Sequence, residues 1–171
     1  MPDINRFKQQ LADGGARPNQ FKVNITFPTG GEWVGDKQLL VTGAALPAST
    51  VNPVITQYRG REIKFAGERI FDPWTITIVN DNKMSLREGF EKWMELMNEK
   101  ESNEGKIAWD EYSKRIVIQH LDRNNDPTNT ITLIDAFPIN MSEIALAYAQ
   151  NDIIEEYTVT FQYQTYESNL G

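Results

Sequence analysis

Apolar side chains occupy every second position in several segments of this chain, and the pattern is longest near its end. Residues 155–167, EEYTVTFQYQTYE, place Tyr157, Val159, Phe161 and Tyr163 between polar neighbours. Residues 21–27 and 74–78 alternate in the same way. Because successive side chains of a strand point to opposite faces of a sheet, this pattern predicts half-buried strands.

Strands are expected to account for most of the chain. Residues 38–46, 61–67, 114–121 and 130–138 are further predicted strands, 122–129 a turn, and 139–154 either a short helix or a strand. A length of 171 residues suffices for one domain with its own core. The expected fold is a single, mainly β domain over 1–171. It would be an antiparallel β-sandwich or barrel of about seven or eight strands with one packed α-helix.

One segment, 84–100, is predicted to be that helix. Ser85 and Glu88 fit a capping box, in which two side chains bond backbone N–H groups of the first turn. An apolar face follows at helical spacing, with glutamates opposite. The apolar residues are Leu86, Phe90, Trp93, Met94 and Met97.

Two segments are expected to lie outside the core. Residues 46–60, LPASTVNPVITQYRG, have extended character but contain Pro47 and Pro53, which cannot donate a hydrogen bond to a sheet. They are therefore expected to form an exposed excursion or an edge hairpin. Residues 1–15 combine Ile4, Phe7 and Leu11 with the pair Gly14-Gly15, and are predicted to be a mobile, amphipathic segment.

Charge is unevenly distributed along the chain. The net charge is −7, and no Lys or Arg follows Arg123, whereas seven Asp and Glu residues do. This asymmetry fits either an acidic solvated surface or a negative field on one face. In both cases, the sequence lacks the basic surface that a nucleic-acid-binding protein needs.

The sequence contains neither a Cys nor an apolar run long enough to cross a membrane. Its first residues lack the apolar region of a signal peptide. Folding inside a cell, without disulfides or a membrane anchor, is therefore expected.

Residues that could carry chemistry do not form a recognisable site. The only histidine, His120, has no second histidine or cysteine with which to build a metal site or a triad. Residues 122–133 begin like a calcium loop, but Pro127 and Leu133 stand where such a loop requires Gly and Glu. Glu155 and Glu156 would point to opposite faces of a strand. No catalytic, cofactor-binding or metal-binding residue is predicted. Trp33, Trp74, Trp93 and Trp109 are expected in the core.

Several short motifs, in their order and spacing, resemble the tail tube proteins of contractile-tailed bacteriophages. The resemblance extends over residues 16–167, is most specific at 61–81, and is weaker over 26–43 and 98–130. The matching residues are Ala16-Arg17-Pro18-Asn19 before Phe21 and Val23; Leu46-Pro47-Ala48; Arg61, Ile63, Ala66-Gly67, Arg69, Phe71, Trp74, Thr75, Thr77 and Asn80-Asp81; and the strand that ends at Tyr166-Glu167.

The resemblance implies a non-enzymatic structural protein of the virion, with a fold related to type VI secretion tube proteins. Subunits would form hexameric rings, and stacked rings would form a rigid tube inside a contractile sheath. Phage DNA would pass along the bore during ejection. The implied partners are further copies of the chain, the sheath protein, and the baseplate and tube-terminator proteins. Assembly would take place in the host cytoplasm, and the tail of the virion would be the final location.

Two sets of residues follow as candidate contact sites. Neighbouring subunits would complete exposed strand borders, and residues 46–60 would reach such a neighbour. The residues expected at this contact are Leu46, Pro47, Val51, Val54, Ile55 and Tyr58, with a mobile surface loop as the alternative. The bore is expected to be lined by Glu155, Glu156, Thr158, Thr160 and Gln162, or by Thr75 and Thr77.

Other functions stay open as alternatives. A tube initiator near the baseplate, or a tube protein of a secretion-type injection machine, would have the same fold. A monomeric β-barrel would hold a small ligand in an apolar cavity. An enzyme would need convergent titrating groups, which cannot be named in this sequence.

Overall fold

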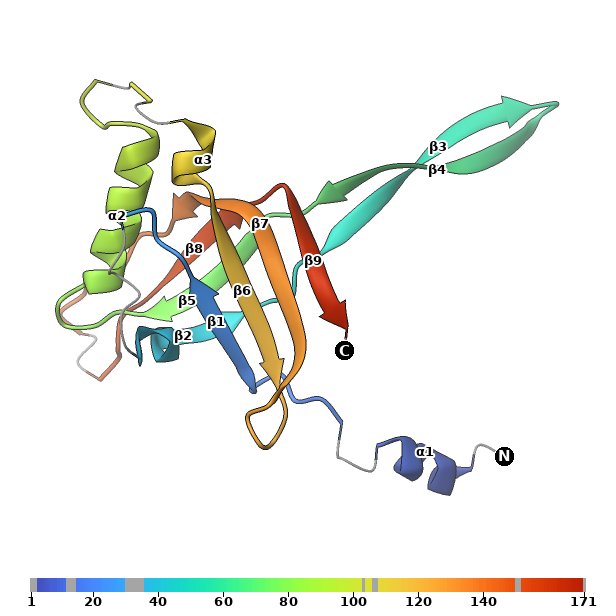
Figure 1. The fold of residues 1–171 in the computed structure, drawn as a ribbon, viewed down its shortest axis with the longest axis horizontal. Helices are drawn as coiled ribbons and strands as arrows, with labels where there is room; N and C mark the ends of the chain where they lie inside the picture. Colours follow the sequence, from blue (N-terminus) through green and yellow to red (C-terminus); the bar gives the residue numbers. More distant parts are fainter. Residues whose placement is uncertain are drawn as a thin grey trace.

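The computed structural model describes residues 3–11, 15–29, 36–102, 104–105, 108–149 and 152–170. It has a β-rich body, from which a long two-stranded hairpin extends to one side, while a short N-terminal helix lies apart from the body (Figure 1). Antiparallel strands dominate, and one longer helix packs against them. The fold class expected from the alternation is confirmed.

The described residues contain nine strands, three α-helices and one 3-10 helix. The strands are β1 (Phe21–Ile25), β2 (Val41–Ala44), β3 (Ser49–Tyr58), β4 (Arg61–Phe71), β5 (Trp74–Val79), β6 (Lys114–Leu121), β7 (Pro127–Met141), β8 (Glu156–Gln162) and β9 (Thr165–Leu170). The helices are α1 (Ile4–Gln10), η1 (Asp36–Leu40, the 3-10 helix), α2 (Ser85–Met97) and α3 (Trp109–Tyr112).

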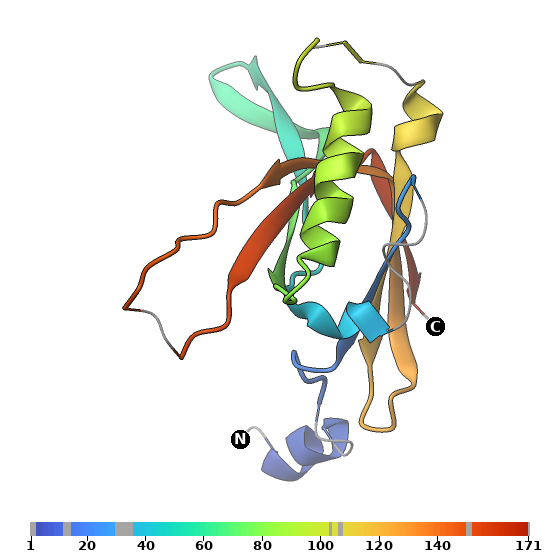
Figure 2. The same ribbon diagram turned by 90° about the vertical axis from the view of Figure 1, so that its left-hand side faces the viewer.

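Seven of the strands form one bent sheet in the order β1–β6–β7–β8–β5–β2, with β9 also paired to β7. All of its pairings are antiparallel. The first part of β7 pairs with β6 and β9, and its last residues pair with β8. The sheet therefore consists of two halves that share β7, and α2 lies against them (Figure 2).

The bend in β7 lies at Asp135, whose φ of 57° is left-handed. The register between β6 and β7 shifts beside it, which is the mark of a β-bulge that turns a strand. The neighbouring strand breaks at the same level, where Gln164 N donates to Ile134 O at 3.1 Å between β8 and β9. The prediction of one strand over 155–167 was therefore wrong, because that segment has to follow β7 around the bend.

The core lies between the two halves of the sheet and α2, and aromatic rings fill its centre. The ring of Phe161 lies 5.7 Å from that of Trp74, 5.9 Å from that of Phe90 and 6.1 Å from that of Trp93. Phe27 packs on the same two helix residues. Truncation of one such buried ring to alanine typically costs about 3–5 kcal/mol, so this cluster contributes strongly to the stability of the body.

The alternating strands bury the predicted faces. Exposures of 2% or less are found at Tyr157, Val159, Phe161 and Tyr163, and at Trp74, Ile76 and Ile78. Trp93 is also buried, as expected, but the prediction for Trp109 was wrong: it begins α3 and is 47% exposed. Trp33 lies outside the described residues.

Two further segments differ from the prediction. Residues 38–46 hold only the four-residue strand β2, because the chain enters it from the 3-10 helix η1. Residues 139–154 fitted a helix or a strand equally well. Of these, 139–141 continue β7, whereas 142–149 and 152–154 form neither a helix nor a strand and lead to β8. This is the outcome expected where the apolar residues have no clear period.

The cap of α2 differs from the predicted capping box. Met84 precedes the helix with a φ of 50° and makes no side-chain cap. Asp81 supplies the cap: its carboxylate accepts hydrogen bonds from Ser85 N at 2.8 Å and from Ser85 Oγ at 2.7 Å. Glu88 instead pairs with Lys92 at 2.8 Å. The capping-box prediction was wrong because Ser85 already lies inside the helix.

Removal of the Asp81 cap should destabilise the protein measurably. We expect Asp81→Ala to cost about 1 kcal/mol, the usual loss for a helix cap. Glu88→Ala should cost clearly less, because it removes only an exposed ion pair. Urea unfolding at pH 7 compares the two variants, and equal losses would contradict the assigned cap.

The Asp81 contribution should also depend on pH. The hydrogen bond from the Ser85 side chain holds the pKa of Asp81 below its ordinary value of 3.8. A carboxylate whose pKa is lower in the folded state stabilises that state above the unfolded pKa and loses this effect as the pH falls through the folded pKa. The stability difference between the wild-type chain and Asp81→Ala should therefore shrink when unfolding is measured below pH 3.8.

Candidate assembly surfaces

A hairpin formed by β3 and β4 is the most prominent feature outside the body (Figure 1). We call residues 49–71 the arm. Its strands pair from Ser49–Phe71 at the base to Tyr58–Arg61 at the tip, and in the described chain they pair with no other strand. At about 3.3 Å per residue, a ten-residue strand spans roughly 33 Å. The excursion predicted over 46–60 thus supplies one strand of a longer hairpin. Residues 61–67, expected in the body, belong to the other.

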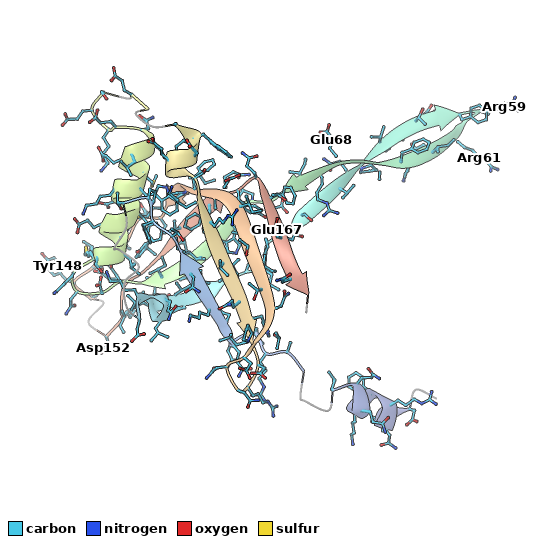
Figure 3. All side chains as sticks on the ribbon, viewed as in Figure 1. Arg59, Arg61, Glu68, Tyr148, Asp152 and Glu167 are labelled. Atoms are coloured by element: carbon cyan, nitrogen blue, oxygen red, sulfur yellow. The ribbon has the colours of Figure 1, made fainter. Side chains whose placement is uncertain are left out.

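The tip of the arm is a tight turn formed by Arg59 and Gly60, whose φ angles are 48° and 79°. Two residues with positive φ match a type I′ turn, whose twist suits a hairpin. The Arg59 guanidinium lies 5.4 Å from the centre of the Tyr58 ring, and Tyr58 pairs across the strands with Arg61. An aromatic and two cationic side chains therefore project together at the far end of the arm (Figure 3).

A β-bulge interrupts the arm between Val51 and Pro53. Pro53 has no N–H group and is tolerated here, where the ladder is already broken. Opposite it, a Cβ at Gly67 would overlap the backbone oxygen of Asn52, so this close approach requires glycine. The proline that argued against an ordinary strand is thus accommodated by the bulge.

One face of the outer half of the arm is apolar and exposed. The register places Val54 opposite Phe65 and Thr56 opposite Ile63, on the face that also carries Tyr58. The exposed fractions are 55% for Val54, 57% for Phe65 and 60% for Tyr58. The opposite face carries the pairs Ile55–Lys64 and Gln57–Glu62. Contiguous exposed apolar side chains mark a surface that contacts another molecule.

The six residues predicted for an inter-subunit contact divide into two groups. Val51, Val54, Ile55 and Tyr58 lie on the arm, and all are exposed. Leu46 and Pro47 precede the arm and lie beside the body. Leu46, which is 55% exposed, lines an apolar pocket of about 350 Å³ together with Phe21 and Ile118. Their contact with another subunit stays a prediction.

Sequence reasoning missed the apolar residues of the second arm strand. Ile63, Phe65 and Ile70 are 39%, 57% and 51% exposed. Alternation alone does not distinguish a strand of the body from a strand of a free hairpin. The available clue was the Arg59-Gly60 dipeptide, which two extended segments flank.

Aromatic residues fix the base of the arm to the body. The ring of Phe71 lies 5.9 Å from that of Tyr163 and 5.6 Å from that of Tyr166. The Tyr163 hydroxyl donates to Ala48 O at 3.3 Å, and burial raises the pKa of Tyr163, so this phenol stays a donor at neutral pH. The Trp74 indole donates to Ala45 O. These contacts set the direction in which the arm leaves the body.

A second candidate surface is the outer face of β5 and β8. Glu156, Thr158, Thr160 and Gln162 alternate along β8 with its buried residues and therefore share this face. The neighbouring strand adds Thr75, whose hydroxyl lies 3.0 Å from that of Thr160, and Thr77 opposite Thr158. This face therefore presents hydroxyl and amide groups with one carboxylate at its end.

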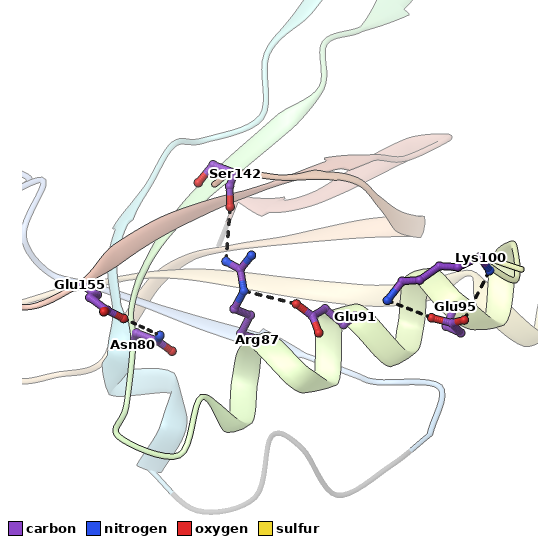
Figure 4. A network of polar contacts seen from close by, with 7 residues as sticks. All are labelled: Asn80, Arg87, Glu91, Glu95, Lys100, Ser142 and Glu155. Carbon is purple, nitrogen blue, oxygen red and sulfur yellow. Dashed lines mark hydrogen bonds and ion pairs between the residues drawn. The ribbon is translucent and has the colours of Figure 1, made fainter. Parts of the chain in front are cut away.

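Glu155 does not share this face with the other predicted bore residues. It precedes β8, and its carboxylate accepts a hydrogen bond from Asn80 Nδ2 at 3.1 Å (Figure 4). Asn80 N also donates to Glu155 O at 2.8 Å. Glu155 thus ties the chain before β8 to the end of β5.

The segment between β7 and β8 is a third exposed surface. We call residues 142–149 and 152–155 the β7–β8 loop. Arg87 of α2 holds its start: Nη1 donates to Ser142 O at 3.3 Å, and Nε pairs with Glu91 at 3.3 Å (Figure 4). Large apolar side chains of this loop are nevertheless exposed, with fractions of 79% at Leu146, 69% at Ile153 and 70% at Ile154; Tyr148 is fully exposed. No periodic pattern indicated these residues in the sequence.

Groups that could carry chemistry are engaged in structural contacts. His120 Nε2 lies 3.0 Å from Arg17 O. Asp122 Oδ1 accepts from the backbone N–H groups of Asn124 and Asp126 at 2.7 and 2.9 Å, which makes a turn of the calcium-like segment. Over the described ranges, no group of three His, Cys, Asp or Glu residues could hold a metal ion. In the same ranges, no helix combines the length and the apolar character needed to cross a membrane.

Comparison with known proteins bears on these surfaces. The family model described as phage tail tube protein matches residues 16–169. The tail tube protein of Serratia phage KSP90 is 29% identical over 168 residues, which are 95% of this chain and 95% of that protein. Tail tube protein gp19 of Enterobacteria phage T4 is 31% identical over 156 residues, 89% of this chain and 91% of that protein. These matches confirm the resemblance drawn from the motifs.

A solved structure shares the fold at lower sequence identity. A chain in the sheath–tube complex of the PVC extracellular contractile injection system superimposes with a TM-score of 0.62 at 16% identity. The match covers 94% of this chain and 96% of the other.

Removal of the arm should leave the body folded. We expect a chain in which an Asn-Gly turn replaces residues 51–69, joining the paired residues Thr50 and Ile70, to keep its near-UV circular dichroism and urea midpoint. The reason is that the base contacts of Phe71 remain. By contrast, Phe71→Ala should lower the stability by about 2 kcal/mol, because this ring is only partly buried. Loss of the near-UV signal in the shortened chain would contradict an independent body.

Proposed function

Because the chain belongs to the family of phage tail tube proteins, we propose that six copies close into a ring and that such rings stack into the rigid inner tube of a contractile tail. The protein would act as a structural part of the virion and not as an enzyme. The observation that carries this proposal is the arm, whose apolar face the described chain leaves uncovered.

The arm supports assembly through a head-to-tail contact. One copy would place its arm on a different surface of the next copy, and such a contact closes into a ring when the rotation per subunit allows it. A second contact, along the axis, does not close and extends the rings into a tube. Complete burial of a side chain such as Val54 or Phe65 contributes roughly 1.5–3 kcal/mol, so a few arm residues suffice to drive association.

Free strand borders offer a further means of association. In the described part of the chain, β1, β2 and β9 each pair with a single strand. Each therefore has a border of N–H and C=O groups that a strand of another copy could complete. In a closed ring these borders would be covered, which removes the risk of uncontrolled edge-to-edge aggregation.

The outer face of β5 and β8 is our candidate for the wall of the bore. Its residues are Glu156, Thr158, Thr160 and Gln162, with Thr75 and Thr77 beside them. Six chains, each with a net charge of −7, would carry −42 per ring. Passing DNA would meet hydroxyl and carboxylate groups instead of the Lys and Arg contacts that retain phosphates by counterion release. At physiological salt this repulsion extends about 8 Å, so it acts only at the wall.

A tube of this kind requires partners around it and at its ends. The likeness to a chain of a sheath–tube complex supports a sheath protein as one partner. Baseplate and tube-terminator proteins are the partners expected at the two ends. The virion tail is the proposed location, with assembly in the host cytoplasm.

An injection tube that carries no genome is the second candidate, because the fold likeness to the PVC complex favours it. A tube initiator would share the surfaces but would form a single ring at the baseplate. A monomeric ligand-binding barrel is not favoured, because the rings of Trp74, Phe90, Trp93 and Phe161 occupy the interior that a ligand would need.

The first test of this proposal is electron microscopy of the purified, concentrated chain. We expect rings or hollow tubes from the full chain, on its own or with a baseplate nucleus, and neither from the chain that lacks residues 51–69. The near-UV bands of tryptophan should be retained in both proteins, because all four Trp residues lie outside the deleted segment. Tubes formed without the arm would contradict the role assigned to it.

The second test concerns the bore. Glu156→Lys combined with Thr160→Lys would place cations on the proposed wall, and virions that carry this variant should release DNA several-fold more slowly. The matched control, Glu101→Lys with Ser102→Lys, adds the same charge to the exposed turn that follows α2. Equal release rates for the two variants would show that the outer face of β5 and β8 does not line the bore.

A further inference from the structure

The two limbs of the β7–β8 loop border an open pocket whose lining is part apolar and part acidic. Ile144 and Leu146 lie on one limb of the loop and Ile153 and Ile154 on the other, and the pocket between them has a volume of about 650 Å³. Pockets of about 300–1,000 Å³ typically enclose a bulky organic group. The exposure of Leu146, Ile153 and Ile154, at 69% or more, means that water now covers this apolar surface.

The rim of this pocket is acidic. Asp152, Glu155 and Glu156 line the pocket, and the loop contains neither Lys nor Arg. Glu143 belongs to the same loop but does not line the pocket. Glu155 is bonded to Asn80, whereas Glu143 and Asp152 are exposed. The closest described cation on α2, Arg87, is held by Glu91 and Ser142 at the base of the loop. An apolar occupant with positive charges at its border would therefore fit.

The tip of the arm has the complementary character. Tyr58 is 60% exposed, Arg59 stacks on its ring, and Arg61 lies opposite it on the same face. Neither arginine belongs to an ion pair between described residues. Tyrosine and arginine are also the residue types that contribute most at the centres of protein interfaces.

The two surfaces lie at opposite ends of the molecule. Arg59 and Arg61 mark one end, and Tyr148 and Asp152 lie near the other (Figure 3). The tip and the loop of one chain therefore do not meet, whereas the tip of one copy and the loop of another can. A contact between two different surfaces of identical chains is head-to-tail and repeats from copy to copy.

We propose that the β7–β8 loop is the receptor for the arm: Tyr58 of one copy enters the pocket of the next, and Arg59 and Arg61 face Asp152 at its rim and Glu143 elsewhere in the same loop. This inference deepens the proposed tube function and rests on it. Burial of the tyrosine ring supplies the attraction, and the charges select the orientation and suppress wrong contacts.

The first experiment detects the contact by disulfide formation. The chain has no Cys, so Thr56→Cys on the apolar face of the arm and Ala147→Cys in the pocket introduce the only thiols. The two single variants are mixed under assembly conditions and oxidised mildly. We expect a linked dimer of one copy of each. The control mixes Thr56→Cys with Asp126→Cys, which lies in the β6–β7 turn. Its yield of linked dimer should be at least about tenfold lower.

The second experiment reverses the charges. Arg59→Glu with Arg61→Glu should raise the concentration needed for half assembly at least about tenfold, the equivalent of 1.4 kcal/mol. Glu143→Lys with Asp152→Lys should have a similar effect, because either change places like charges together. The fourfold variant restores opposite charges and should assemble within about threefold of the wild-type chain. Sedimentation measures assembly, and near-UV circular dichroism verifies that each variant is folded.

The outcomes separate this inference from the tube proposal. Failure of the wild-type chain to assemble, even with a nucleus, would overturn the tube. Wild-type tubes without the specific disulfide, or without recovery in the fourfold variant, would overturn the docking and leave the tube intact. The helix α1 is another basic and apolar segment that could occupy the pocket. If Arg6→Glu with Lys8→Glu, and not the arm variant, restored the assembly of the Glu143→Lys, Asp152→Lys chain, α1 would be the occupant and the proposal would be overturned.

Discussion

The uncovered apolar face of the arm is the constraint on which the proposed assembly depends. A hairpin of two strands cannot bury both faces with its own residues, and alone in water it is marginally stable at best. Here Val54, Phe65 and Tyr58 remain more than half exposed along a hairpin that pairs, in the described chain, only with itself. Association with a second molecule would cover this surface, and the proposed head-to-tail arrangement places the arm of each copy on a different surface of the next.

Strand β8 and the residues on either side of it contact the core, the proposed bore wall, the base of the arm and the β7–β8 loop. On its inner face, β8 carries Phe161, around which the aromatic core is built. Its outer face presents Thr160 beside Thr75. Directly after β8, Tyr163 holds the base of the arm, and directly before it lies the β7–β8 loop. A shift of this strand would therefore move the proposed bore wall, the arm and its proposed receptor together.

The alternating strands and their buried faces could be predicted from the sequence. Apolar residues at every second position indicate which side chains of a strand point toward the core. It could not tell that Ile63 and Phe65 face solvent, since a strand of a free hairpin alternates like one of the body. Nor could it locate the bend at Asp135, which depends on a positive φ and on the pairing of β7 with three strands. The cap of α2 was predicted at Ser85 and Glu88 because the capping-box motif was present. In the structure, the carboxylate of Asp81, four residues upstream, accepts the hydrogen bonds of Ser85 N and Oγ instead. The exposed apolar residues of the β7–β8 loop follow no period, so only the three-dimensional structure reveals them.

Hydrogen–deuterium exchange before and after assembly tests the central claim most directly. The amide groups of the arm, residues 49–71, should exchange rapidly in the isolated chain, because an uncovered hairpin opens easily. In assembled tubes the same amides should gain protection of at least about a hundredfold, while the core strands, already protected, change little. Arm amides that exchange equally fast in the isolated chain and in the tube would contradict the claim that a second copy covers the arm.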